Sequence, residues 1–266
     1  MLRLSRLLGA ARQPARLSIV KIVLVTGASR GIGAATARLA GRRGYTVCIN
    51  YVSSKAKAEE VASDIRQGGA EAFLVQADTA DEDAVVRMFE TIDREVGPID
   101  ALVNNAGIVG PPGPLDGQSG ADIRRVLDVN LFGTILCCRE AVKRMSTKHG
   151  GKGGAIVNLS SVAAREGAPK EWTPYGASKG GVSTFTLGLA REVAGEGVRV
   201  NAILPGLIET DMHAGDFASA RLERLKPSIP IGRAGAPEEC AEAILWLLSD
   251  QASYVAGAVL PVTGAR

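Results

Sequence analysis

Seven short apolar runs alternate along the chain with segments of helical character, and this alternation restricts the folds that the chain can adopt. The runs lie at residues 19–25, 46–51, 72–78, 100–107, 153–161, 198–206 and 258–262. The early runs are continuously apolar, as expected for strands that are covered on both faces. Strands separated by helices pair in parallel. The sequence therefore predicts an α/β fold with one doubly wound, seven-stranded, mainly parallel sheet and helices on both faces.

The segments between these runs have the composition and periodicity of helices. They include a Lys/Glu/Ala-rich stretch that ends at Gly68, a helix over about 81–96, a long helical segment over about 120–148 and a helix near 237–249. Right-handed crossovers place such helices on both faces of the sheet and leave ligands to bind beyond the carboxyl ends of the strands. We therefore expect the functional residues directly after strands.

Composition limits the class of protein. The 266 residues are 46% hydrophobic, which is enough for a substantial core, and charged or polar residues interrupt every apolar run before the length of a membrane span. The formal charge of +3 includes five basic residues within the first 21 positions, where there is no acid, so the remainder is slightly acidic. We predict neither a membrane span nor nucleic-acid binding.

The first 18 residues are rich in Arg, Leu, Ala and Ser and contain no acid. This composition is typical of a mitochondrial transit peptide, and the alternative is a leader or disordered segment without a function. We expect one catalytic domain over residues 19–266 and a cytoplasmic location, or the mitochondrial matrix if residues 1–18 are a transit peptide.

The four cysteines show no CxxC spacing, and the two histidines form no HExxH pattern. We expect reduced cysteines in the core and no metal site.

The first apolar run ends in TGASRGIG, which places Gly27, Gly31 and Gly33 between a strand and a helix. Small residues there let backbone N–H groups and the helix dipole approach a pyrophosphate. A tight strand-to-helix turn without a ligand is the alternative. The context favours a dinucleotide and a Rossmann domain.

The end of the second run distinguishes between the two nicotinamide dinucleotides. NAD sites usually hold a carboxylate there for the ribose 2′-hydroxyl. This run ends in Asn50 and Tyr51, the first acid after it is Glu59, and Arg30 lies in the glycine loop. Arg30 can pair with a 2′-phosphate, although it can equally be a solvated loop cation. We predict NADP, with NAD as the less favoured cofactor.

Taken together, the motifs resemble those of the short-chain dehydrogenase/reductase family from residue 19 onward. They comprise TGASRGIG, NNAG at 104–107, LDVNLFG, NLSSVA, YGASK at 175–179 and LPGLIETDM at 204–212. The resemblance implies a catalytic set of Asn130, Ser161, Tyr175 and Lys179. It also implies that Asp78 reaches the adenine, that residues 105–107 line the ribose, and that Ile208 and Thr210 hold the nicotinamide carboxamide. The residues expected at the cofactor are Gly27, Ser29, Arg30, Gly31, Ile32, Gly33, Asn50, Tyr51, Asp78, Thr79, Asn105, Ala106, Gly107, Tyr175, Lys179, Pro205, Gly206, Ile208 and Thr210.

Tyr175 and Lys179 stand four positions apart, which places them on one face of a helix. A lysine ammonium near a phenol favours the phenolate, as proton transfer to or from an alcohol requires. Ser161 precedes Tyr175 by 14 positions, one more than is familiar in the family, and Ser160 is the alternative serine. In a structural interpretation Thr173 caps the helix, and Tyr175 and Lys179 form a surface pair. Close packing would explain Gly176, Gly180 and Gly181 in this helix.

The resemblance implies a small-molecule carbonyl or alcohol substrate and a homotetramer, with a dimer as the alternative. Residues 162–174, including Glu171 and Trp172, and residues 207–228, including Met212, His213 and Phe217, are expected near the substrate. Two reactions compete, reduction of a 3-oxoacyl thioester and oxidation of a sugar such as glucose. A catalytically silent NADP-binding module is the alternative from another class.

Overall fold

The computed structural model describes residues 20–210 and 223–266. The leader segment at residues 1–18 and the central part of the expected substrate segment, with Met212, His213 and Phe217, lie outside the described residues.

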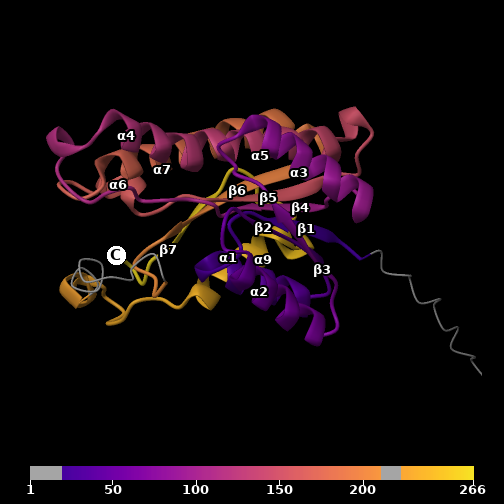
Figure 1. The fold of residues 1–266 in the computed structure, drawn as a ribbon, viewed down its shortest axis with the longest axis horizontal. Coiled ribbons are helices and arrows are strands. Elements are labelled where there is room, and N and C mark those ends of the chain that lie inside the picture. Colours follow the sequence, from indigo (N-terminus) through magenta and orange to yellow (C-terminus); the bar gives the residue numbers. More distant parts are fainter. Residues whose placement is uncertain (1–19, 211–222) are drawn as a thin grey trace, which may run out of the picture.

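Seven strands in the described ranges form one sheet in the order β3-β2-β1-β4-β5-β6-β7, and every neighbouring pair is parallel (Figure 1). The bounds are β1 Ile22–Val25, β2 Thr46–Tyr51, β3 Ala72–Gln76, β4 Ala101–Asn104, β5 Gly154–Leu159, β6 Val198–Pro205 and β7 Val259–Val262. The predicted doubly wound fold is confirmed. All neighbouring pairs of these strands are parallel, because each connection crosses over and returns the chain to the end of the sheet at which the previous strand began.

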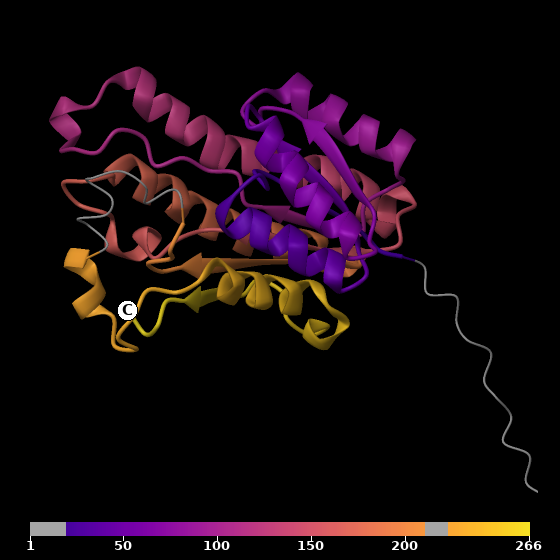
Figure 2. The same ribbon diagram turned by 60° about the horizontal axis from the view of Figure 1, so that its bottom comes forward.

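Helices cover both faces of the sheet, as Figures 1 and 2 show. One layer contains α1 (Gly31–Arg42), α2 (Lys55–Gln67) and α9 (Pro237–Leu248). The other contains α3 (Glu82–Glu95), α4 (Gly120–Leu127), α5 (Gly133–Met145) and α7 (Thr173–Val193), with the short α6 (Ala163–Glu166) beside α7. Short 3₁₀-helical turns lie at Leu115–Gly117, Thr147–His149, Ala194–Glu196, Lys226–Ser228 and Asp250–Ala252.

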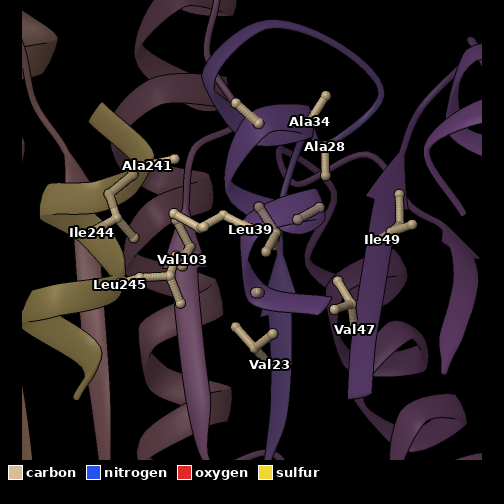
Figure 3. Close-up of a cluster of buried hydrophobic side chains, with 14 of the residues drawn as sticks. Val23, Ala28, Ala34, Leu39, Val47, Ile49, Val103, Ala241, Ile244 and Leu245 are labelled. Atoms are coloured by element: carbon tan, nitrogen blue, oxygen red, sulfur yellow. The ribbon is translucent and has the colours of Figure 1, made fainter. Parts of the chain in front are cut away.

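The core consists of two apolar layers, one on each side of the sheet. Figure 3 shows part of the layer between the sheet and helices α1 and α9, where Val23 and Val103 of the strands face Leu39 and Ile244. The opposite layer packs β-strand residues such as Leu24 and Ile156 against Phe89 of α3 and Val193 of α7. Adjacent residues of one strand therefore enter different layers, which explains the uninterrupted apolar runs.

The predicted helix over 120–148 is interrupted. A π-helical turn, η2, occupies Asp128–Phe132 between α4 and α5. A single π-helical turn of this kind corresponds to one extra residue inserted in an α-helix, and such turns are frequent at functional positions. The periodicity of the side chains in the sequence does not reveal them. This one contains Asn130, whose side chain is fully buried.

The four cysteines are buried free thiols, as predicted. Burial raises the pKa of Cys48 to about 12, so this thiol stays neutral. Within the described ranges no helix is both long and apolar enough to cross a membrane.

Candidate active site

The order of the strands changes direction between β1 and β4, which are neighbours although two strands separate them in sequence. Crossover connections on the two sides of this point run to opposite halves of the sheet and leave a crevice at the carboxyl edge. The loops after β1 and β4 meet there, because the backbone N–H of Thr26 donates to Val103 O.

The glycine loop after β1 is held by side chains from two other strands. The amide oxygen of Asn50 accepts from Gly27 N at 3.1 Å, while its nitrogen donates to Val75 O and Ala77 O. The Asn105 amide nitrogen donates to Thr26 O at 2.9 Å and Gly27 O at 3.0 Å. These bonds fix the loop conformation through the protein alone.

Two glycines of this loop have left-handed backbones, Gly27 with φ 61° and Gly31 with φ 55°. Gly33 is required for a different reason, since a Cβ there would lie 2.4 Å from the Asn105 amide nitrogen and 2.7 Å from Gly27 O. Helix α1 begins at Gly31 without an acidic residue in its first turn, and Arg30 precedes it. The loop is thus an N–H-rich, electropositive helix terminus that suits a pyrophosphate.

The far end of the crevice, after β2 and β3, is lined by Arg30, Tyr51, Ser53, Ser54 and Asp78. The carboxylate of Asp78 accepts from Arg125 Nη2 of α4 at 2.7 Å and from Ala80 N at 3.0 Å. The Asp78 carboxylate is therefore paired with a cation at this end of the crevice. No acidic side chain of the described residues follows β2 in the lining.

The two candidate serines after β5 have different surroundings. Ser160 Oγ donates to Lys179 O at 2.8 Å and lies 2.8 Å from Ser183 Oγ, so it joins the strand end to α7. Ser161 Oγ accepts from Ala163 N at 3.2 Å, and its O–H donates to no acceptor among the described residues. Ser161 is thus the serine with a proton to offer a ligand.

Tyr175 and Lys179 lie in the first two turns of α7. The Lys179 ammonium nitrogen donates to Leu159 O at 2.7 Å and lies 5.8 Å from the centroid of the Tyr175 ring. Lys179 is buried, and burial lowers its pKa from 10.5 to about 8. The surface-pair interpretation is therefore wrong for Lys179. Thr173 also does not act as a cap, because it is the first helical residue and the N-cap position is Trp172.

Asn130 joins the loop after β4 to α7. Its amide accepts from Ile108 N and donates to Ile108 O, each at 2.8 Å, and donates to Ser178 Oγ at 3.0 Å. All its amide bonds therefore go to protein groups. They fix residue 108 beside the catalytic turn.

Two of the three glycines singled out in the N-terminal half of α7 show how closely this helix packs. A Cβ on Gly176 would lie 2.8 Å from Gly167 O, and one on Gly181 would lie 2.8 Å from the Leu131 side chain. Gly180 has room for a Cβ, with the nearest atom, Ala164 O, at 3.9 Å. Close packing is confirmed for Gly176 and Gly181, and nothing in the structure explains Gly180.

One cavity of about 620 Å³ brings most of the predicted site residues together. It is lined by Gly27, Ser29, Arg30, Gly31, Ile32, Tyr51, Asp78, Thr79, Asn105, Ala106, Gly107, Ser161, Tyr175, Lys179, Pro205, Gly206, Ile208 and Thr210. Gly33, Asn50 and Asn130 are not in the lining. They support it from behind, through the contacts described above.

The cavity also has walls that the sequence did not predict. Arg125 reaches it from α4 and Arg266 from the segment after β7, whereas Glu166 of α6 belongs to the stretch 162–174 that was expected near the substrate. Arg125 is visible in sequence only as one cation of an amphipathic helix, and Arg266 belongs to no motif. Their positions depend on elements that are remote in sequence.

Known proteins resemble the chain over most of its length. The family described as Enoyl-(Acyl carrier protein) reductase matches residues 27–264. The "Uncharacterized oxidoreductase YgfF" of Escherichia coli (strain K12) is 52% identical over 92% of this chain and 99% of its own. The chain belongs to the short-chain dehydrogenase/reductase family.

Other members of this family confirm the resemblance read from the motifs. "Cis-4-hydroxycyclohexanecarboxylate dehydrogenase" of Sinomonas cyclohexanicum is 42% identical over 92% of this chain and 95% of its own. The reductase FabG of Staphylococcus aureus (39%; 93% and 98% covered) and "Glucose 1-dehydrogenase 2" of Bacillus subtilis (38%; 92% and 93% covered) are also similar. Among solved structures, a short-chain dehydrogenase/reductase of Mycobacterium marinum superposes with a TM-score of 0.86 at 31% identity, covering 92% of this chain and 94% of that one.

Membership establishes the class of chemistry. The protein is an oxidoreductase that acts on CH–OH or C=O groups with a nicotinamide dinucleotide. The cavity fits such a cofactor, because it runs from an electropositive helix terminus, past Asn105 and Gly107, to Tyr175 and Lys179.

Proposed function

We propose that this protein is an NADP(H)-dependent oxidoreductase that interconverts a small-molecule carbonyl and a secondary alcohol, with Ser161, Tyr175 and Lys179 in contact with the reacting groups. The juxtaposition of Ser161, Tyr175 and the buried Lys179 at one wall of the cavity carries this proposal. A silent NADP-binding module has no need for a serine hydroxyl that donates to no acceptor among the described residues, or for a lysine buried at an energetic cost.

A bound nicotinamide would supply a hydride to the carbonyl carbon, or would accept one from the alcohol carbon in the reverse direction. During reduction, the Ser161 O–H donates to the carbonyl oxygen and orients it, and the Tyr175 hydroxyl transfers its proton to that oxygen. The Lys179 ammonium stabilises the resulting phenolate, and Leu159 O holds the ammonium in place. Oxidation of the alcohol runs through the same groups in reverse. Asn130 positions this machinery through its hydrogen bonds to Ile108 and Ser178.

The preference for NADP rests on the charges near the expected ribose. Arg30 of the glycine loop lines the cavity, and the lining residues after β2, which include Ser53 and Ser54, are uncharged. A 2′-phosphate would receive a guanidinium partner and hydroxyl donors without facing a carboxylate.

Replacing Arg30 tests this preference. We expect Arg30→Ala to lower kcat/KM about tenfold with NADPH and to leave kcat/KM with NADH nearly unchanged, because the variant loses one charge-assisted contact. Arg43→Ala is the matched control, since Arg43 is an exposed α1-terminal arginine that pairs with Glu242. Equal losses with both cofactors would remove the basis for NADP selectivity.

The lining of the cavity at the end away from the glycine loop bears on the class of substrate. Val109, Ala168, Trp172 and Leu207 form apolar walls at the substrate end, which is unlike the small polar pocket that a sugar such as glucose requires. Reduction of a 3-oxoacyl thioester is therefore the better of the two named alternatives.

We also propose a homotetramer, with a dimer as the alternative. The exposed apolar side chains of Phe132 and Leu187, which belong to η2 and α7, support the proposal. Light scattering of the purified protein measures the assembly, and a monomer would contradict it. The relatedness to bacterial oxidoreductases supports a cytoplasmic location.

The central experiment is turnover of a panel of ketones with NADPH by the wild-type protein and Tyr175→Phe. Loss of the proton donor is expected to lower kcat by a factor of about 10³, within the usual range for general acid catalysis. NADPH affinity, measured by fluorescence titration, should change little. Tyr254→Phe is the control, since Tyr254 is fully exposed. Unchanged turnover in Tyr175→Phe would exclude this mechanism, and no turnover by the wild-type protein on any ketone would favour the silent module.

A further inference from the structure

The cavity has a second charged feature at the end opposite the adenosine. Arg30 follows β1, Asp78 follows β3 and Arg125 of α4 pairs with Asp78, whereas Glu166 follows β5 and Arg266 follows β7. Figure 1 shows the segment after β7 at the same end of the molecule as α6. Among the described lining residues of that end, Glu166 and Arg266 are the charged groups, apart from Lys179 at the centre.

Arg266 is held in place by its own segment. The chain after β7 turns through Ala265, which has a left-handed φ of 74°, and Ile231 N donates to Gly264 O at 3.3 Å. A Cβ on Gly206 would lie 2.8 Å from Thr263 Cα, so this segment packs directly against the loop after β6. The Arg266 side chain is only 19% exposed. Its guanidinium therefore belongs to the cavity wall.

The guanidinium of Arg266 retains hydrogen-bonding capacity. One terminal nitrogen donates to Glu166 Oε2 at 3.2 Å, and within the described part of the chain its side chain has no other partner. A guanidinium has five N–H donors in a planar fork, so most of them are available to a ligand. Glu166 is the more solvated partner, with 40% of its side chain exposed. Its single contact with Arg266 therefore compensates the charge of the guanidinium only in part.

From this arrangement we infer that Arg266 recognises a carboxylate on the substrate. The inference rests on the proposed function and names its substrate class, a ketone or secondary alcohol that carries a carboxylate beyond an apolar ring or chain. The apolar part lies against Val109, Ala168, Trp172 and Leu207, and the carboxylate meets the open edge of the guanidinium. Planar, bidentate pairing is the geometry that a guanidinium offers a carboxylate.

The charge balance of the cavity favours a monoanion over a phosphate. The described lining contains four cations, Arg30, Arg125, Lys179 and Arg266, and two acids, Asp78 and Glu166, so its field attracts anions. At the substrate end, however, a dianion would face one guanidinium together with the Glu166 carboxylate. A single carboxylate is the anion that Arg266 can neutralise there.

Binding of unreactive ligands to the NADP-loaded protein tests the inference independently of turnover. Isothermal titration calorimetry would compare cyclohexanecarboxylate with cyclohexanecarboxamide, which has nearly the same shape and no charge. We expect the carboxylate to bind on the order of tenfold more tightly, as a charge-assisted hydrogen-bonded pair at a partly exposed site provides. Arg266→Gln should abolish the difference, and Arg266→Lys should retain part of it. Glu166→Gln should strengthen binding of the carboxylate alone, because it removes the competing acid.

Arg165→Gln is the matched control, since Arg165 is an exposed arginine of α6 outside the cavity lining. Equal affinities of the two ligands in the wild-type protein, or a preference that survives in Arg266→Gln, would overturn the inference. Kinetics with ketones that carry either a carboxylate or a carboxamide separate this failure from failure of the proposed function. Turnover of the neutral ketones that depends on Tyr175 would keep the oxidoreductase proposal even if Arg266 made no difference.

Discussion

The cofactor loop after β1 and the substrate-side turn between α6 and α7 both contain left-handed backbone, but at different types of residue. The loop after β1 has left-handed backbone at Gly27 and Gly31, where a side chain is absent. The turn between α6 and α7 has left-handed backbone at Ala168 (φ 47°) and Lys170 (φ 62°), where a side chain makes this conformation unfavourable by about 1–2 kcal/mol. The cofactor loop is therefore relaxed, whereas the substrate-side turn stores strain.

The two regions are also held differently. Asn50 and Asn105 fix the cofactor loop through partly buried hydrogen bonds to its backbone, and Thr26 Oγ1 of the loop accepts from Ala106 N. The substrate-side turn is held by Trp172 Nε1, which donates to Gly110 O at 3.1 Å, by Glu171 O, which accepts from Gly113 N, and by the ion pair of Glu171 with Arg224. A relaxed loop with a fixed backbone suits a cofactor that is the same in every reaction. The substrate-side turn is held partly by the side chains of Trp172 and Glu171, so substitutions there can change the wall that contacts the substrate.

The largest expected effect concerns Lys179, where the two regions meet. Its pKa is about 8 in the folded protein and 10.5 in the unfolded chain, so between these pH values the unfolded chain binds more protons. The wild-type protein therefore gains stability relative to Lys179→Met as the pH rises from about 8 to 10.5, by on the order of 3 kcal/mol. Urea denaturation of both proteins across this range, without cofactor, measures the gain. A constant difference would show that burial does not depress this pKa.

Substitution of Gly33 would break the relaxed loop. Gly33→Ala places a methyl group against the Asn105 amide and Gly27 O, and overpacking of this kind costs about 2 kcal/mol. We expect a lower midpoint of thermal unfolding and loss of NADPH binding in fluorescence titration. Gly117→Ala is the control, because a Cβ there meets nothing within 4 Å. Wild-type cofactor affinity in Gly33→Ala would contradict the proposed tightness of this loop.

The smallest effect tests the strain of the substrate-side turn. Lys170 is exposed, so Lys170→Gly relieves its left-handed backbone without loss of packing. After the greater flexibility of glycine in the unfolded chain is subtracted, a stabilisation of about 0.5 kcal/mol remains. Lys170→Ala keeps the strain and should not stabilise. Calorimetric unfolding of both variants provides the comparison, and equal midpoints would mean that no strain is stored at this position.

Local patterns predicted the sheet and the helix that carries Tyr175 and Lys179, because both depend on short-range rules. Continuous apolar runs indicate strands covered on both faces, and the spacing of Tyr175 and Lys179 requires only a helix. Periodicity did not reveal the π-helical turn at Asn130, since it identifies helical segments and not a single wider turn within one. Neither the sequence pattern nor the structure explains why position 180 is a glycine.

The sequence by itself determined the fold class, the glycine loop and the residues at the centre of the proposed reaction. Tertiary structure decided which of two serines has a free proton, that Lys179 is buried, and that Asn50 and Asn130 support the cavity instead of lining it. It also placed Arg266 beside Glu166, 100 positions away in the chain. The physical reason is that strand and helix patterns follow from neighbours in sequence, whereas burial, hydrogen-bond partners and charge pairs follow from which segments the sheet order brings to one edge.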